Sequence, residues 1–105
     1  MIASNTTIQT ARARLYMRLL YKHFGHLVDV ERNGESACLI KFGFGTGDMT
    51  TVDDELTLTA RADDEMSLAR VETVLESHLE RFAFREGLIV NWSRAYRKSS
   101  TQRVD

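Results

Sequence analysis

The chain has 105 residues, a formal net charge of -1 and a pI near 6.3. Its 43% hydrophobic and 28% charged residues are typical of one small globular domain, not of a disordered chain. The near-neutral charge gives no reason to expect nucleic acid or an anionic membrane as a partner. No apolar stretch is long enough to span a bilayer.

The compartment is inferred from the N-terminus and from cysteine usage. Residues 1–6 contain neither a basic start nor an apolar run, so no signal peptide is expected. Cys38 is the single cysteine, which excludes an internal disulfide and suits a reducing compartment. We therefore expect a cytoplasmic protein.

The N-terminal third predicts a short strand and then a helix. Residues 6–9 have β propensity and are expected to form a brief edge strand. Thr10 suits an N-cap, residues 11–24 contain no Gly or Pro, and Gly25 suits a helix end. The predicted apolar face of this helix contains Ala11, Leu15, Tyr16, Leu19, Leu20 and His23. The opposite side carries Arg14, Arg18 and Lys22.

The middle of the chain predicts two hairpins. Residues 27–31 alternate between apolar and polar, and a two-residue Asn-Gly turn at 33–34 leads to a second strand at 37–42. The glycine-rich stretch 43–47 superficially resembles a phosphate-binding loop. Strand-like residues follow it instead of a helix, so a turn or bulge is the better interpretation. Residues 49–60 then predict a hairpin that turns at 53–55.

The C-terminal third predicts a longer helix and a last strand. Asp63 or Asp64 is expected to open the helix and Gly87 to end it. Residues 88–92 are expected to form the last strand. Residues 1–93 would then be a single domain, and residues 94–105 a polar, basic and flexible tail. The core stripe of this helix is expected at Leu68, Val71, Leu75, Leu79 and Phe82.

These elements follow the order β-α-β-β-β-β-α-β. Consecutive hairpins indicate a mostly antiparallel sheet, and two amphipathic helices between strands fit most easily on one of its faces. The sequence therefore predicts an α+β fold, a two-layer sandwich with both helices packed on the same face of the sheet.

Three histidines are candidate metal ligands: His23, His26 and His78. His23 and His26 are three residues apart, but Gly25 between them is expected to break the helix. No His-Glu-x-x-His or paired-cysteine motif accompanies them. Because His23 lies on the predicted apolar face, a histidine buried in the core is the alternative to a metal ligand.

The segment at residues 78–86 is the most distinctive local feature. On a helix, His78, Arg81 and Arg85 would lie along one edge of the apolar stripe, where two guanidiniums beside an imidazole can bind a carboxylate or phosphate. In the alternative, both arginines pair with acids of the sheet. No activated nucleophile is recognisable, and Cys38 is expected to be buried and inert, so the pattern favours binding over catalysis.

Charge is unevenly distributed along the chain. Residues 48–80 contain ten acids against two arginines (net -8), and residues 81–105 contain six bases against two acids (net +4). Complementary patches between the protomers of a homodimer are one interpretation. Solvated faces that meet within one monomer are the other.

Residues 22–26 and 78–86, followed by Trp92, resemble the hallmarks of the bacterial domain-of-unknown-function 2218 family. The resemblance covers nearly the whole chain up to Trp92. It departs from the family pattern at Tyr21, where cysteine is frequent, at Leu27, where lysine is common, and at Gly87, where an acidic or larger residue is frequent. The usual opening pattern of the family is matched by Thr10, Arg12, Ala13 and Tyr16.

The resemblance implies a small cytoplasmic bacterial protein without an assigned activity, associated in some members with siderophore or iron utilisation. We expect a non-catalytic binding or accessory module for an anionic small molecule or a protein partner. The alternative is a metal- or cofactor-dependent enzyme, or a metal carrier, that uses the three histidines; no particular cofactor is indicated. The candidate ligand-binding residues are His78, Arg81, Arg85, Glu86, Tyr16 and Arg12.

Overall fold

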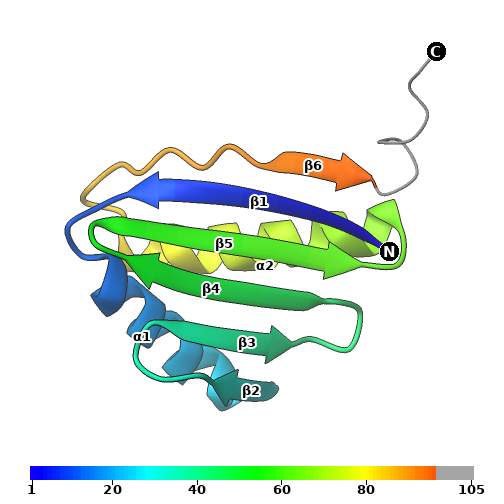
Figure 1. Ribbon diagram of the computed structural model, residues 1–105, viewed down its shortest axis with the longest axis horizontal. Helices are drawn as coiled ribbons and strands as arrows, with labels where there is room; N and C mark the ends of the chain where they lie inside the picture. Colours follow the sequence, from blue (N-terminus) through cyan, green and yellow to red (C-terminus); the bar gives the residue numbers. More distant parts are fainter. Residues whose placement is uncertain (97–105) are drawn as a thin grey trace.

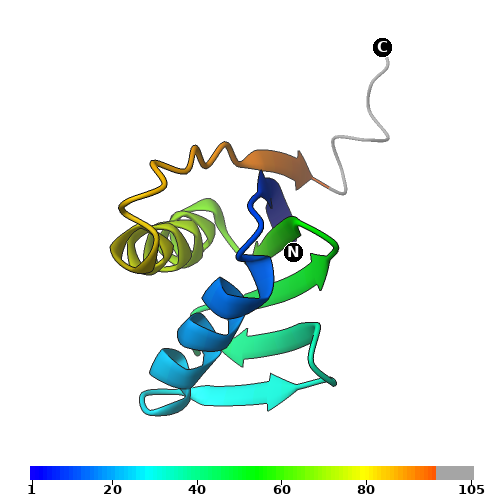
Figure 2. The ribbon, with the colours of Figure 1, turned by 90° about the vertical axis from the view of Figure 1, so that its left-hand side faces the viewer.

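The computed structural model describes residues 1–96. Its elements are β1 (Ile2–Gln9), α1 (Ala13–Gly25), β2 (Asp29–Arg32), β3 (Ala37–Lys41), β4 (Thr46–Val52), β5 (Glu55–Ala62), α2 (Glu65–Phe82) and β6 (Ser93–Tyr96). One sheet contains all six strands in the order β2-β3-β4-β5-β1-β6, and every neighbouring pair is antiparallel. Figure 1 and Figure 2 show both helices on the same face of this sheet. The predicted α+β sandwich and its order of elements are confirmed.

The core lies between the helices and the sheet. Strand β5 alternates along its length, burying every second side chain from Leu56 to Ala62 against the helices. Full burial of an aliphatic side chain contributes about 1.5–3 kcal/mol. Within residues 1–96, neither helix combines the length and apolar character that a membrane span needs. The predicted stripe of α2 is buried at Leu68, Val71, Leu75 and Leu79, and Phe82 is half-buried at its end.

The apolar face of α1 is rotated relative to the prediction. Ala11 precedes the helix and Leu15 is exposed, because the first helical residue is Ala13. Thr10 is not the N-cap: Arg12 occupies that position, and its backbone N–H donates to the Thr10 hydroxyl at 3.1 Å. The residues that α1 buries are Ala13, Tyr16, Met17, Leu20 and Phe24.

Two strands differ from their predicted positions. Strand β1 starts at Ile2 and lies between β5 and β6, so it is not a short edge strand. The last strand is Ser93–Tyr96, whereas residues 88–92 run alongside α2, where Trp92 Nε1 donates to Glu76 Oε1 at 3.0 Å. The predicted tail therefore begins with residues of β6, and its residues 97–105 lie outside the described part of the chain.

The two hairpin turns have different lengths. The loop between β2 and β3 has four residues (33–36) instead of two, since β2 ends at Arg32 and β3 begins at Ala37. Gly34 in this loop has φ of 75°, a conformation that favours glycine. The turn between β4 and β5 has two residues, 53 and 54, and lies at the predicted position.

A buried carboxylate on α2 holds strand β6. Glu72 is 8% exposed; Ser4 Oγ donates to its Oε2 at 2.6 Å, and Arg94 donates to both of its oxygens at 2.9 and 3.1 Å. Burial alone raises the pKa of Glu72, but the hydrogen bonds from Arg94 and Ser4 outweigh it, and the pKa is lowered overall. These bonds explain why the last strand forms at Ser93–Tyr96, because Arg94 of this strand pairs with the buried carboxylate of Glu72.

Glu72→Ala is expected to lower the free energy of unfolding by about 2–3 kcal/mol, because it removes the hydrogen bonds that Glu72 accepts from Ser4 and Arg94. Urea denaturation followed by circular dichroism measures this change. Glu80→Ala, at an exposed position of the same helix, is the matched control and should change little. Equal effects of the two substitutions would show that the Glu72 bonds contribute nothing to stability.

Candidate functional site

Three donors from the start of α1 converge on the carboxylate of Glu86. Thr10 Oγ1 donates to Oε1 at 2.9 Å, the Tyr16 hydroxyl donates to Oε2, and Arg12 Nη1 donates to Oε2 at 3.3 Å. The Tyr16 hydrogen bond is the main cause of a lowered pKa for Glu86. Burial, followed by the bond to Glu86, raises the pKa of Tyr16. We call Thr10, Arg12, Tyr16 and Glu86 the Glu86 cluster.

The Glu86 cluster joins the two helices. Helix α2 ends at Phe82, before the predicted end at Gly87, and Glu86 lies in the turn that follows, where its N–H donates to the Ala83 carbonyl at 3.0 Å. The predicted ligand residues Arg12, Tyr16 and Glu86 are thus hydrogen-bonded to one another. Thr10 was missed as their partner, although it belongs to the same opening pattern. The cluster holds the start of α1 against the end of α2.

The two helices also bring together His23 and His78, which we call the histidine pair. Their ring centroids are 4.7 Å apart, and their planes are inclined by 39°. The Phe24 ring lies 4.9 Å from His78, and the Phe82 ring lies 6.2 Å from His23. Both imidazoles are half-buried. His23 is therefore neither sealed in the core nor freely exposed.

The hydrogen bonding of His78 determines which of its nitrogens is available. Its Nδ1 lies 2.8 Å from the Val74 carbonyl oxygen, and because a carbonyl only accepts, Nδ1 carries the hydrogen. Neutral His78 therefore keeps the lone pair on Nε2. Burial is the main cause of a lowered pKa for His23, and the charges of His78, Arg81 and His26 lower it further. His23 is uncharged at about pH 7.

The third histidine does not join this contact. His26 directly follows α1 and is exposed, and the ring contacts of the histidine pair involve Phe24 and Phe82 instead. Across residues 1–96, no group of three or more His, Cys, Asp or Glu is arranged to hold a metal ion. A metal ion bound by all three histidines stays a prediction.

The two arginines of the motif occupy different environments. Because α2 ends at Phe82, Arg85 does not continue a helical edge from His78. Arg81 is exposed in the last turn, and the guanidinium carbon of Arg85 lies 5.4 Å from the centroid of the Phe84 ring. In the described part of the chain neither arginine forms an ion pair with a carboxylate, so the predicted pairing with acids of the sheet is not seen there.

A row of aromatic rings continues from the histidine pair to the turn between β3 and β4. Phe24 contacts Phe42 edge to face at 5.3 Å, and Phe42 stacks on Phe44 at 5.5 Å. The guanidinium carbon of Arg70, on α2, lies 3.9 Å from the centroid of Phe44. These contacts fill the space where α1, α2 and the turn meet.

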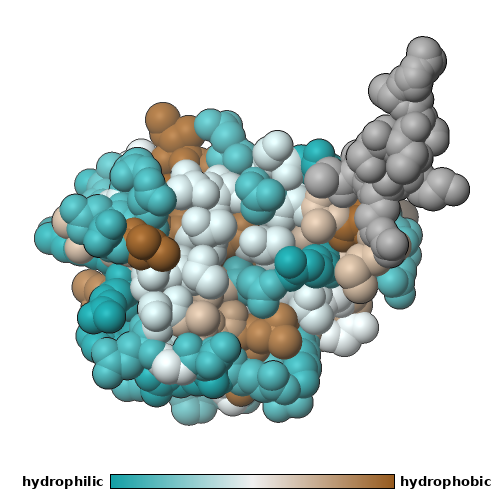
Figure 3. All heavy atoms as spheres, in the orientation of Figure 1, coloured by the Kyte–Doolittle hydropathy of each residue, from teal (hydrophilic) through white to brown (hydrophobic). Residues whose placement is uncertain are grey.

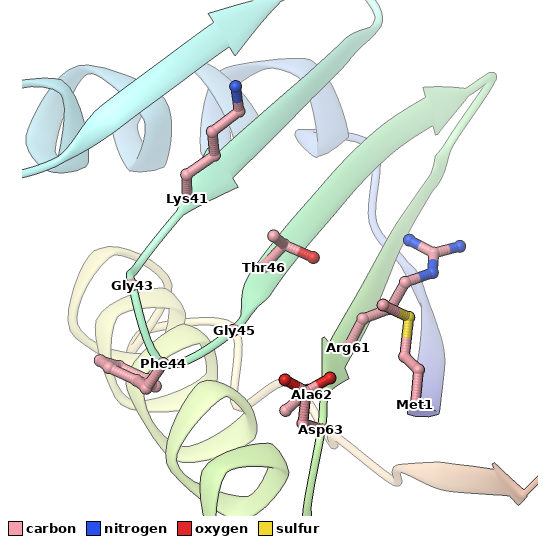
Figure 4. Close-up of a pocket in the computed structure, with 9 residues that line it drawn as sticks. All are labelled: Met1, Lys41, Gly43, Phe44, Gly45, Thr46, Arg61, Ala62 and Asp63. Carbon is pink, nitrogen blue, oxygen red and sulfur yellow. The ribbon is translucent and has the colours of Figure 1, made fainter.

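The glycine-rich turn borders a hollow of about 330 Å³ (Figure 4). Phe44 extends toward α2, whereas Lys41 and Arg61 extend away from it. A Cβ atom at Gly45 would lie 2.5 Å from the carbonyl oxygen of Arg61, so close packing of the backbone explains this glycine. Strand β4 follows the turn, as predicted, so the turn does not lead into a helix N-terminus as a phosphate-binding loop does.

Cys38 is buried in β3, as expected. Burial raises the pKa of its thiol to about 12, so the thiolate form that a nucleophile needs is scarce at neutral pH. The thiol therefore serves as a small core side chain.

Comparison with known proteins gives a family and a fold. The family model described as "Uncharacterized protein conserved in bacteria (DUF2218)" matches residues 5–93. The NMR structure of PA4090 from Pseudomonas aeruginosa is similar, with 31% sequence identity and a TM-score of 0.76 over 89% of this chain and 96% of that chain. None of the curated proteins compared with the chain matches it significantly. The family match includes the Glu86 cluster and the histidine pair.

Glu86→Gln is expected to lower the melting temperature above about pH 5, and this effect should shrink as the pH falls below about 4.3. The pKa of Glu86 is lower in the folded state than in the unfolded state, where it is about 4.3. Ionised Glu86 therefore stabilises the fold above about pH 4.3, and this stabilisation is lost as the pH falls through the pKa of the folded state. Thermal unfolding followed by circular dichroism tests this, with Glu80→Gln as the exposed control. A difference from wild type that is the same at both pH values would contradict it.

Proposed function

The chain belongs to the DUF2218 family of uncharacterised bacterial proteins, and we propose that it is a cytoplasmic, non-catalytic binding or accessory module. Its ligand is an anion bound at the histidine pair. The observation that carries this proposal is the contact of the two imidazoles beside the charge of Arg81. A role in siderophore or iron utilisation is part of the proposal, because siderophores bind iron through anionic oxygen groups.

An anion at this position would meet donors that have no acidic partner. Protonated His23, Nε2 of protonated His78 and the Arg81 guanidinium all donate hydrogen bonds. No carboxylate within residues 1–96 forms an ion pair with any of them. Burial and nearby positive charge hold the pKa of His23 down, and a bound anion would counter the effect of that charge. Binding should therefore strengthen as the histidines become protonated.

Two observations support a binding role over a catalytic one. The Cys38 thiol is buried, and its raised pKa removes it as a nucleophile. Glu86, one of the two carboxylates of the motif, already accepts hydrogen bonds from three side chains and is not poised to move a proton. The other carboxylate, Glu80, is exposed, and the remaining polar groups of the motif, His78, Arg81 and Arg85, are donors suited to holding a negative charge.

Citrate and inorganic phosphate are expected to raise the pKa of His23 and to shift the imidazole signals of His78, both measured by NMR titration. Arg81→Gln is expected to weaken citrate binding about tenfold at about pH 6, because it removes one charge-assisted hydrogen bond. Arg14→Gln, an equal charge change at an exposed position beside Glu35, is the control and should bind like wild type. The proposal fails if the histidine signals do not respond to either anion, or if both arginine variants bind citrate equally.

A metal carrier or metal-dependent enzyme is a second candidate, favoured by the hydrogen bond of His78. Metal-ligating histidines commonly donate their second N–H to a carbonyl or carboxylate, and the Nδ1 bond to the Val74 carbonyl has this form. It leaves Nε2 as the metal-binding nitrogen, beside the ring of His23. Other ligands would have to come from His26, solvent or a bound molecule.

Stoichiometric zinc is expected to shift the NMR signals of His23 and His78 together if this second candidate is right. His23→Ala should then abolish the shift of His78. The matched variant His26→Ala shows whether two or three histidines bind the zinc. It should abolish zinc binding if His26 is a third ligand and preserve it if only His23 and His78 are ligands. Unchanged histidine signals at equimolar zinc would exclude zinc binding by these residues and leave the anion proposal unaffected.

A further inference from the structure

One face of the sheet is covered by no element within residues 1–96. Both helices lie on the opposite face (Figure 2), and Figure 3 looks onto the open one, where residues of intermediate hydropathy form a pale area across the middle. Strand pairing identifies the side chains on this face, since directly opposed residues share a face. Those of β1, β4 and β5 include Asn5, Thr7, Gln9, Thr46, Asp48, Thr50, Val52, Glu55, Thr57, Thr59 and Arg61.

Polar groups on this open face are largely bonded to one another. Arg61 pairs with Asp48, Lys41 pairs with Glu31, and Gln9 Nε2 donates to Glu55 Oε2 at 2.7 Å. The hydroxyls of Thr7 and Thr57 are 3.1 Å apart. Burying paired charges and threonine methyl groups costs less than burying unpaired charges. This face is therefore suited to contact with another surface.

The charges along β5 make this face complementary to itself. Arg61 lies toward one end and Glu55 at the other, with Thr57 and Thr59 between them on the same face. Consider a second copy packed face to face on the first, related by a two-fold axis that is parallel to the sheet, perpendicular to β5 and centred on the middle of that strand. This axis places Arg61 over Glu55 of the second copy. The same axis places Thr59 over Thr57 of that copy. Each dimer then contains two such ion pairs, related by symmetry.

The same axis brings no like charges together on the neighbouring strands. On β4, Asp48 lies opposite Thr50 of the second copy. On β1 the axis opposes Asn5 to Thr7. On β3 it opposes Leu39 to Ala37. None of these positions opposes two like charges. Sheets that pack face to face lie about 10 Å apart, a gap that arginine and glutamate side chains span together.

We propose that the open face is the interface of a homodimer with this two-fold axis. The six strands are four to eight residues long, and at about 3.3 Å per residue and about 4.8 Å between strands they give a face of about 600 Å². Two copies would bury at most about 1,200 Å² in total, at the lower end of specific interfaces. The dimer is therefore reversible and depends on protein concentration.

A charge-swap experiment tests the proposal. Wild type should dimerise with rising concentration in sedimentation equilibrium. Arg61→Glu and Glu55→Arg, each alone, should weaken dimerisation at least tenfold, because like charges then oppose at both symmetric positions. An equimolar mixture of the two variants should dimerise again, because every contact in the mixed dimer joins opposite charges. Circular dichroism confirms that each variant is folded.

Two further variants separate the interface from effects within one monomer. Thr57→Lys breaks no ion pair, yet it places a charge at the centre of the interface and should also give monomers. Arg14→Glu, on the helix side, should leave dimerisation unchanged. A wild type that is monomeric at all concentrations, or a mixture of charge-swap variants that stays monomeric, would overturn the proposal.

Discussion

The hydrogen bonds that Glu86 accepts from the start of α1 determine how the two helices lie. Within residues 1–96 these are the side-chain hydrogen bonds that attach the turn after α2 to the start of α1, and apolar packing and ring contacts hold the rest of the helix pair. The histidine pair depends on this attachment, because His23 comes from the last turn of α1 and His78 from α2. The Glu86 cluster, which contains the predicted ligand residues Arg12, Tyr16 and Glu86, thus helps to position the histidine pair.

A second carboxylate, near the middle of α2, also links separate elements. Glu72 binds Ser4 of β1 and Arg94 of β6, so one side chain links the helix to two strands. Buried carboxylates are costly unless they are well hydrogen-bonded, and here both oxygens are occupied. The segment between Glu86 and Arg94 is therefore held at both ends, although it contains no regular structure until β6.

Periodicity predicts the local parts of this fold and fails where distant residues decide. The stripe of α2 and the turn after β4 depend on short-range patterns; the stripe was predicted correctly up to the half-buried Phe82, and the turn at 53–54 is one residue shorter than predicted. Residues 88–92 have stronger β propensity than Ser93–Tyr96, yet the strand forms at the latter because Arg94 pairs with Glu72. The contact between His23 and His78 is likewise tertiary, and neither histidine has a local signal that identifies its partner.

The two polar surfaces lie on opposite sides of the sheet, and this separation makes them independent. The histidine pair sits between the helices, while the proposed dimer interface uses the face that the helices leave open. Dimerisation would therefore leave the histidine pair accessible and present two copies of it on outward sides of the assembly. A ligand or partner carrying two anionic groups would gain affinity only if its length spans that separation.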